Sequence, residues 1–128
     1  MEPQLRILTS ASFAPELAKV MSVPHTMLTL PDDPAGTREL LLETDVLVYP
    51  EFRPEWRSDG SKRLRLVHST GAGVDGIDRA SLPHGCMVCN VYGHERAVTE
   101  TAFMHMLALQ KSLLRVDSSL RRGTGPPT

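Results

Sequence analysis

The sequence predicts an α/β protein of the flavodoxin-like class, with a five-stranded parallel sheet, helices on both faces and a long C-terminal helix. Three observations support this prediction. Five short apolar runs alternate with segments of helical pattern. The run at residues 45–49 is apolar enough to be covered on both faces, as strands of parallel sheets usually are. Because crossovers are right-handed, few topologies remain, and we predict the strand order 2-1-3-4-5.

The strands and helices are placed by local signals. The predicted strands lie at residues 5–9, 26–30, 45–49, 65–69 and 87–91. The predicted helices lie at residues 12–21, 37–43, 53–57 and 97–122. Ser12 and the proline three residues later signal the first helix start. Thr37 is the expected cap of the second helix, and Asp59-Gly60 is expected to end the third.

The last helix is the longest and contains no Gly or Pro before Gly123. One apolar stripe runs along it, formed by Val98, Ala102, Met106, Leu109, Leu113, Val116 and Leu120. A second apolar face carries Phe103, Leu107 and Leu114. A helix that is apolar on two sides is normally buried on two sides. We therefore expect residues 97–120 to pack against a larger molecule, a partner or a second copy.

Composition narrows the function classes. The chain has 128 residues, 41% of them hydrophobic, which suits one domain with a core. Its net charge is −1 and its 14 basic residues are scattered, so neither nucleic acid nor a membrane surface is an expected partner. No apolar run approaches the ~18 residues of a membrane span. The N-terminus lacks the features of a signal peptide, so we expect a cytoplasmic protein.

Three glycines follow the fourth predicted strand with the spacing G-x-G-x-x-G, at Gly71, Gly73 and Gly76. This spacing is typical of dinucleotide-binding turns, which open onto a crossover helix. Here only about two helical turns fit before the fifth strand, and Asp75 would place a carboxylate beside the phosphates. The turn is therefore better suited to a small anion such as a carboxylate. A tight turn that binds no ligand is the alternative.

Cys86 and Cys89 form a C-x-x-C motif with His84 and His94 nearby. Thioredoxin-like proteins place this motif at a helix start, whereas here it lies in the fifth predicted strand. Residues three apart in a strand point to opposite faces, so the two sulfur atoms should diverge. We expect two buried thiols and no metal or redox site.

Four segments in combination resemble a known family. They are Leu-Arg-Leu-Val at 64–67, Thr-Gly-Ala-Gly-Val-Asp-Gly-Ile-Asp at 70–78, Gly-Cys-Met-Val-Cys-Asn-Val at 85–91 and Ala-Val-Thr-Glu-Thr-Ala at 97–102. The sequence resembles the N-terminal part of the catalytic, substrate-binding domain of the D-isomer-specific 2-hydroxyacid dehydrogenases. The resemblance implies that the amides of Ala72 and Gly73 bind the carboxylate of a 2-oxo or 2-hydroxy acid. It also implies that Tyr49 lies against the substrate and Val98 near the nicotinamide of NAD(P).

The resemblance stops where the family's cofactor domain would begin. By family likeness, residues 1–96 are a partial substrate-binding domain, 97–123 an interdomain-type helix and 124–128 a tail, and the cofactor domain is absent. In the family the catalytic Arg, Glu and His come from that later region. We therefore assign no catalytic residue here, and His68, His84 and His94 do not match the family's histidine.

Three functional hypotheses follow. The first is a truncated NAD-dependent 2-hydroxyacid dehydrogenase, an oxidoreductase by family, which is inactive alone and does not bind NAD(P) tightly. The second is a non-enzymatic module that binds a carboxylate or dimerises through residues 97–120. The third treats Gly71, Gly73 and Gly76 as a true nucleotide site.

Overall fold

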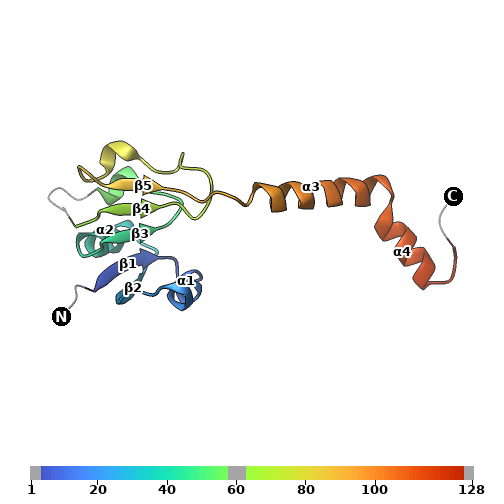
Figure 1. Cartoon of the computed structure of the whole chain (residues 1–128), viewed down its shortest axis with the longest axis horizontal. Helices are drawn as coiled ribbons and strands as arrows, with labels where there is room; N and C mark the ends of the chain where they lie inside the picture. Colours follow the sequence, from blue (N-terminus) through green and yellow to red (C-terminus); the bar gives the residue numbers. More distant parts are fainter. Residues whose placement is uncertain (1–3, 58–62, 126–128) are drawn as a thin grey trace. The chain divides into compact units, whose positions relative to one another are not determined.

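The first unit of the protein is built on a five-stranded parallel sheet (Figure 1). The computed structural model describes residues 4–57 and 63–125, which form two compact units that divide between Val91 and Tyr92. The strand order is β2-β1-β3-β4-β5, so the predicted flavodoxin-like order is confirmed. The strands are β1 (Leu5–Thr9), β2 (His25–Thr29), β3 (Val46–Val48), β4 (Leu66–His68) and β5 (Met87–Cys89).

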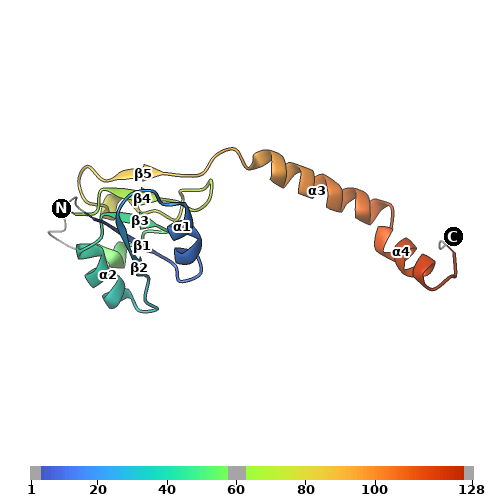
Figure 2. The same ribbon diagram turned by 60° about the horizontal axis from the view of Figure 1, so that its bottom comes forward.

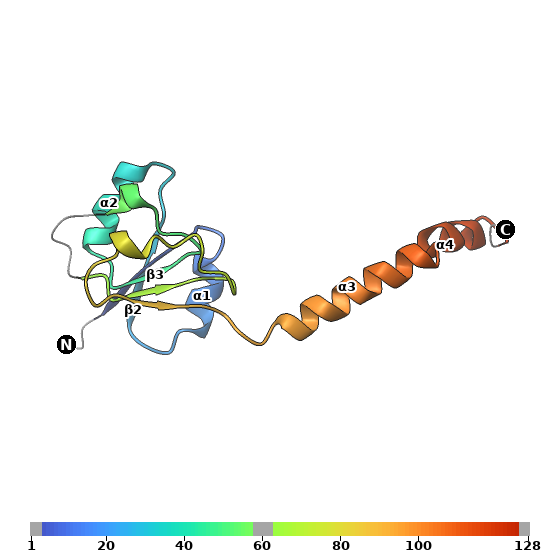
Figure 3. The ribbon, with the colours of Figure 1, turned by 90° about the horizontal axis from the view of Figure 1, so that it is seen from above.

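Helices lie on both faces of this sheet, as predicted (Figures 2 and 3). The helix α1 (Ala14–Val20) covers one face. The other face carries α2 (Pro34–Leu42) and two single-turn 3-10 helices, η1 (Pro54–Trp56) and η2 (Arg79–Ser81). The expected short helix around Trp56 is therefore present as η1, whereas its expected end at Asp59-Gly60 lies outside the described residues.

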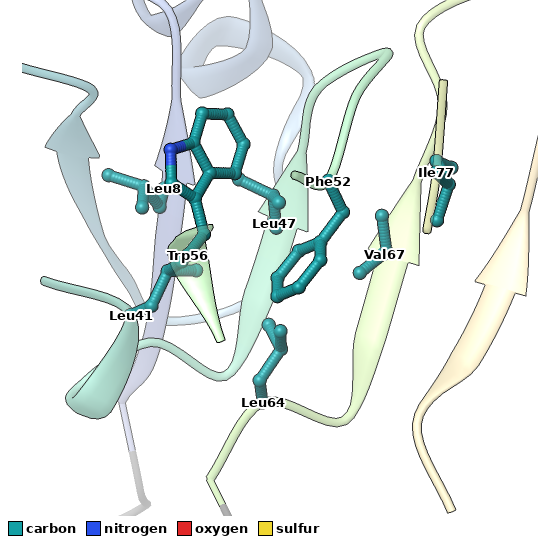
Figure 4. Packing of buried hydrophobic residues seen from close by; sticks show 8 residues of the cluster. All are labelled: Leu8, Leu41, Leu47, Phe52, Trp56, Leu64, Val67 and Ile77. Carbon is teal, nitrogen blue, oxygen red and sulfur yellow. The ribbon is translucent and has the colours of Figure 1, made fainter. Parts of the chain in front are cut away.

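The hydrophobic core lies between the sheet and the side of α2 (Figure 4). Leu8, Leu47 and Val67 stand on adjacent strands and are fully buried. Trp56 and Phe52 pack over these strands, with their ring centroids 6.0 Å apart in an edge-on arrangement. Burying each such side chain stabilises the fold by roughly 1.5–3 kcal/mol. The loop that follows β3 is thereby fixed against the sheet.

The opposite face of the sheet is covered only in part by α1. Side chains of α1 and of the sheet line an apolar groove of about 380 Å³ there. The residues that line it are Leu5, Ile7, Phe13, Leu17, Met21, Val46, Val48, Leu66, His68, Thr70 and Val91. Alternation along the strands separates these side chains from the core on the other face.

The second helix begins earlier than the sequence analysis predicts. Asp33, and not Thr37, caps α2, since its Oδ1 accepts a hydrogen bond from the amide of Gly36 at 2.7 Å. Pro34 takes the first helical position, where its missing N–H is no loss. Thr37 is buried inside the helix and its hydroxyl donates to the carbonyl of Asp33 at 3.1 Å.

The second unit consists of two helices, α3 (Glu95–Gln110) and α4 (Leu113–Arg121). The predicted long C-terminal helix is present as α3, but it does not run on to residue 122. None of the helices in the described part of the chain has the length and hydropathy that a membrane span requires. The assignment of residues 1–96 and 97–123 to functionally distinct parts stays a prediction.

The break between α3 and α4 is at Ser112, which has a φ of 50°. The amides of Lys111 and Ser112 close α3 by donating to the carbonyls of Leu107 and Leu109, at 2.9 and 3.0 Å. The carbonyl of Ser112 then accepts hydrogen bonds from the backbone amides of Arg115 and Val116, and these are the first hydrogen bonds of α4. No Gly or Pro marks this break, which is why a pattern of good helix formers does not reveal it.

Asp45 ties three strands together at the amino-terminal edge of the sheet. Its Oδ2 accepts from the amide of Arg6 at 2.9 Å and from the guanidinium of Arg63 at 3.2 Å. Its carbonyl accepts from the amide of Arg65 at 2.9 Å. Burial raises the pKa of the Asp45 carboxyl, but the Arg6 amide and the guanidinium groups of Arg63 and Arg65 outweigh burial, so the net pKa is lowered.

Replacing this carboxylate by an amide, Asp45→Asn, should lower the free energy of unfolding by about 1.5–3 kcal/mol at neutral pH, the value of hydrogen bonds to charged groups. Since the folded-state pKa is lowered, this stabilisation is fully present above the unfolded pKa of about 4 and is lost progressively as the pH falls from there through the lower folded-state pKa. Urea unfolding at pH 7 and pH 3 measures both effects.

The control for this experiment is Asp117→Asn, which removes an exposed carboxylate paired with Arg121 within α4. Such a helical pair contributes only about 0.3–0.5 kcal/mol. A loss of stability at Asp45 that matched the control, or that stayed constant down to pH 3, would contradict this account of the Asp45 network.

Candidate functional site

The glycine turn lies at the carboxyl edge of the sheet, directly after β4. No crossover helix follows it. After Gly76 the chain makes a single bridge at Ile77, then the 3-10 helix η2, and reaches β5 at Met87. The predicted lack of room for a crossover helix is confirmed. The turn therefore does not fit the pyrophosphate of a dinucleotide, which needs the amino terminus of such a helix.

Three consecutive carbonyls of the turn are held by donors from the ends of β4 and β5. The carbonyl of Gly71 accepts from the amide of Val91 at 3.2 Å. The carbonyl of Ala72 accepts from the side-chain amide of Asn90 at 2.7 Å. The carbonyl of Gly73 accepts from the hydroxyl of Ser69 at 2.7 Å. Each peptide plane of the turn is thus fixed from its carbonyl side.

The amides of Ala72 and Gly73 are left free by this arrangement. The peptide bonds are trans, so each N–H points away from the carbonyl in the same plane. Within the described residues, neither amide donates a hydrogen bond, and both residues are exposed. Two adjacent N–H groups that point away from their anchored carbonyls form a small site for an anion.

Gly71 and Gly73 keep this site uncovered. A Cβ added at Gly71 would meet no atom within 4 Å, and one at Gly73 would meet only the Oδ2 of Asp75, at 3.9 Å. Neither glycine has a positive φ, so no strained backbone requires it. The space beside both Cα atoms is therefore open.

Gly76 has a different role, because it allows two loops to touch. A Cβ on Gly76 would lie 2.9 Å from the carbonyl oxygen of Pro50. Next to this contact, the amide of Phe52 donates to the carbonyl of Gly76 at 3.0 Å. The amide of Asp78 donates to the carbonyl of Phe52 at 2.9 Å. The loop after β3 is therefore fixed beside the end of the glycine turn.

Tyr49 lies at the start of that loop, at the carboxyl end of β3, as predicted. Its amide donates to the carbonyl of His68 at 3.1 Å, and its ring packs against Trp56 with centroids 6.0 Å apart. The ring is thus half-buried beside the core. The structure brings Tyr49, Ala72 and Gly73 to one edge of the sheet, and a contact between Tyr49 and a substrate stays a prediction.

Val98 belongs to the second unit, in the first turn of α3, where 60% of it is exposed. Its predicted place near the nicotinamide stays a prediction. No three His, Cys, Asp or Glu side chains within residues 4–57 and 63–125 are arranged to hold a metal ion.

The two cysteines differ from the prediction in one respect. Cys86 is half-buried, and burial raises the pKa of its thiol. Cys89 is exposed, so the expectation of two buried thiols is wrong for this residue. Cys89 pairs with His68 on the strand face opposite the core, at the edge of the sheet. No helix covers that position, which accounts for its exposure.

Sequence analysis did not identify the residues that hold the turn, Ser69 and Asn90. The available signal was that each is a polar residue at the carboxyl end of a predicted strand, Ser69 in 65–69 and Asn90 in 87–91. Since parallel strands end at one edge of a sheet, such residues meet there. Ser69 is fully buried, and it also accepts from the amide of Gly71 at 3.3 Å.

The chain was compared with known proteins. No protein-family model and no curated sequence matches it. Solved structures do. The pyruvate reductase of Chlamydomonas reinhardtii matches 98% of the chain at 22% identity with a TM-score of 0.65. A D-isomer-specific 2-hydroxyacid dehydrogenase family protein from Aeromonas salmonicida matches 98% at 22% identity, TM-score 0.68. A protein from Pyrococcus horikoshii OT3 matches 95% at 20% identity, TM-score 0.64.

The chain shares its fold with these structures. It covers 40%, 42% and 38% of the three matched chains, so it spans about two fifths of their length. The expected fold, a five-stranded parallel α/β sheet followed by a long helix, is confirmed.

The contact between Gly76 and Pro50 can be tested by adding one methyl group. Gly76→Ala should lower the free energy of unfolding by about 1–3 kcal/mol, because a backbone oxygen 2.9 Å from the new Cβ has to move. Gly71→Ala is the matched control, since its Cβ meets nothing within 4 Å and its effect should stay within about 0.5 kcal/mol or be stabilising. Equal unfolding midpoints in urea for the two variants would contradict this packing.

Proposed function

We propose that these residues form the carboxylate-binding part of a protein of the D-2-hydroxyacid dehydrogenase type. The ligand is a small 2-oxo or 2-hydroxy acid, and its carboxylate accepts hydrogen bonds from the amides of Ala72 and Gly73. The observation that carries the proposal is the fixed orientation of these two free amides. The shared fold and the resemblance of residues 64–102 to the family support it.

The site suits a carboxylate better than a larger anion. A carboxylate has two oxygens and can take one N–H from each of two neighbouring residues. Two charge-assisted hydrogen bonds of about 1.5–3 kcal/mol each correspond to a dissociation constant on the order of 1 mM. The loop at Tyr49 and Pro50 lies beside the end of the turn. It is the part of the chain that we assign to contact the rest of the acid.

Hydride transfer is a separate matter, because it needs a nicotinamide held about 3–3.5 Å from the substrate carbon and a proton donor at the oxygen. By family resemblance the cofactor would be NAD(P), with Val98 on its nicotinamide side. We assign no residue of this chain to the proton transfer. We therefore propose that the 128 residues alone bind the acid but do not bind NAD(P) tightly or reduce the acid.

The binding proposal is tested with Asn90→Ala, which removes the donor that holds the Ala72 carbonyl. Titrating pyruvate into nitrogen-15-labelled protein should shift the amide signals of Ala72 and Gly73 in a saturable way. The variant should bind pyruvate roughly 2- to 10-fold more weakly, since an orienting hydrogen bond contributes about 0.5–1.5 kcal/mol. With NADH and pyruvate, neither protein should cause loss of NADH absorbance.

The matched control is Gln4→Ala, which removes a side-chain amide that donates to the carbonyl of His25 at 2.8 Å beside β2. It should leave pyruvate binding unchanged. The proposal fails if the signals of Ala72 and Gly73 do not respond to pyruvate. Protein-dependent oxidation of NADH would refute the proposed lack of catalysis.

A second candidate function is self-association through α3 and α4. Nine large apolar residues of these helices are more than half exposed, namely Val98, Phe103, Met104, Met106, Leu107, Leu109, Leu113, Leu114 and Leu120. At an area on the order of 100 Å² each, they present about 900 Å², comparable with the ~800 Å² that each partner buries in a standard interface. Surfaces of this kind mark interaction sites. We propose a second copy of this chain as the partner.

Sedimentation velocity over a range of concentrations tests this second candidate. The wild-type chain should form dimers, whereas Phe103→Glu should remain monomeric because it places a charge on an apolar residue that is 61% exposed. Gln110→Glu, at an exposed polar position of the same helix, is the matched control and should dimerise. A wild-type monomer at every concentration would exclude self-association.

A further inference from the structure

The glycine turn carries a negative charge beside its free amides. The Oδ2 of Asp75 lies 3.9 Å from the position that a Cβ would take on Gly73. Since Cβ and N are both bonded to Cα, this oxygen lies within roughly 6 Å of the Gly73 amide. Asp75 is exposed, and no hydrogen bond or ion pair with another described residue engages its carboxylate. Its charge therefore lies near the Gly73 amide, and no described residue neutralises it.

A fixed negative charge next to an anion site weakens the binding of every anion, but not by the same factor. The repulsion grows with the charge of the ligand, so a dianion is penalised twice as much as a monoanion. For a ligand charge held about 6 Å from the Asp75 carboxylate in a water-like dielectric, Coulomb's law gives an affinity loss of about 3-fold for a monoanion and about 10-fold for a dianion. Asp75 would thus favour an acid with one carboxylate over a sulfate or a phosphate ester by about 3-fold.

We infer that Asp75 biases the turn by ligand charge, so that it favours monoanionic carboxylates over dianions. This inference rests on the proposed carboxylate site and adds to it the residue that sets specificity. Asp75 need not touch the bound acid, because it acts on the ligand through the field of its charge. The amides of Ala72 and Gly73 supply the attraction and Asp75 supplies the discrimination.

The test compares two probes, pyruvate as the monoanion and sulfate as the dianion. Asp75→Asn keeps the shape of the side chain and removes its charge. In amide-signal titrations at low ionic strength, the variant should bind pyruvate about 3-fold and sulfate about 10-fold more tightly than the wild type. The preference for pyruvate over sulfate should therefore fall about 3-fold. Raising the salt concentration should reduce this difference, because both charges are exposed to solvent.

Asp32→Asn is the matched control. It removes an exposed carboxylate at the same edge of the sheet, at the end of β2. Three strand spacings separate β2 from β4, which is about 14 Å and more than the screening length of ~10 Å at 0.1 M salt. This variant should leave both affinities unchanged at that ionic strength.

The outcomes separate this inference from the proposed function. If wild-type protein binds pyruvate at Ala72 and Gly73 but Asp75→Asn changes neither affinity, or changes both by the same factor, the role of Asp75 is refuted and the carboxylate site stands. If wild-type protein shows no pyruvate response at these amides, the carboxylate site and the role of Asp75 are both refuted. An equal gain in sulfate affinity in Asp32→Asn would also refute the local role of Asp75.

Discussion

The candidate site depends on one constraint, namely that three donors fix the carbonyls of the glycine turn. The hydroxyl of Ser69, the side-chain amide of Asn90 and the backbone amide of Val91 each bind one carbonyl of residues 71–73. These donors are placed by the pairing of β4 with β5, since the amide of Ser69 itself donates to Cys89 at 2.8 Å. The bonds to Gly71 and Ala72 orient the amides of Ala72 and Gly73, because each N–H shares a peptide plane with the preceding carbonyl. The anion site that we propose is thus built by strand pairing.

Fixed amides can bind an acid without catalysing its reaction. A rigid pair of amides can position an acid by its carboxylate, which is the part of a 2-oxo or 2-hydroxy acid that does not react. Positioning of this kind contributes to catalysis only if a cofactor and a proton donor are held at the reacting carbon. In our proposal, residues 69–91 position the acid and hold neither the cofactor nor the proton donor. We accordingly propose that these residues recognise the acid and discriminate between ligands by charge.

Much of the fold could be predicted because strand patterns and crossover handedness are local or general rules. The run 5–9 matches β1 residue for residue, and the strand order follows from handedness. Three features could not be predicted. Asp33 and Thr37 were both possible caps for α2. Asp33 is the cap because the proline that follows it favours the first helical position. The break at Ser112 has no glycine or proline. The anchoring of the turn joins residues far apart in sequence, such as Asn90 and Ala72, whose pairing no local pattern encodes.

The most direct measurement for the central claim is amide hydrogen exchange of the turn in the absence of ligand. If the carbonyls are held and the amides are free, Ala72 and Gly73 should exchange at nearly the rate of an unstructured chain. The amides of Val91 and Phe52 donate to the carbonyls of Gly71 and Gly76, so they should be protected from exchange. Protection of Ala72 and Gly73 equal to that of Val91 would mean that these amides are already bonded within the protein, and would contradict the account.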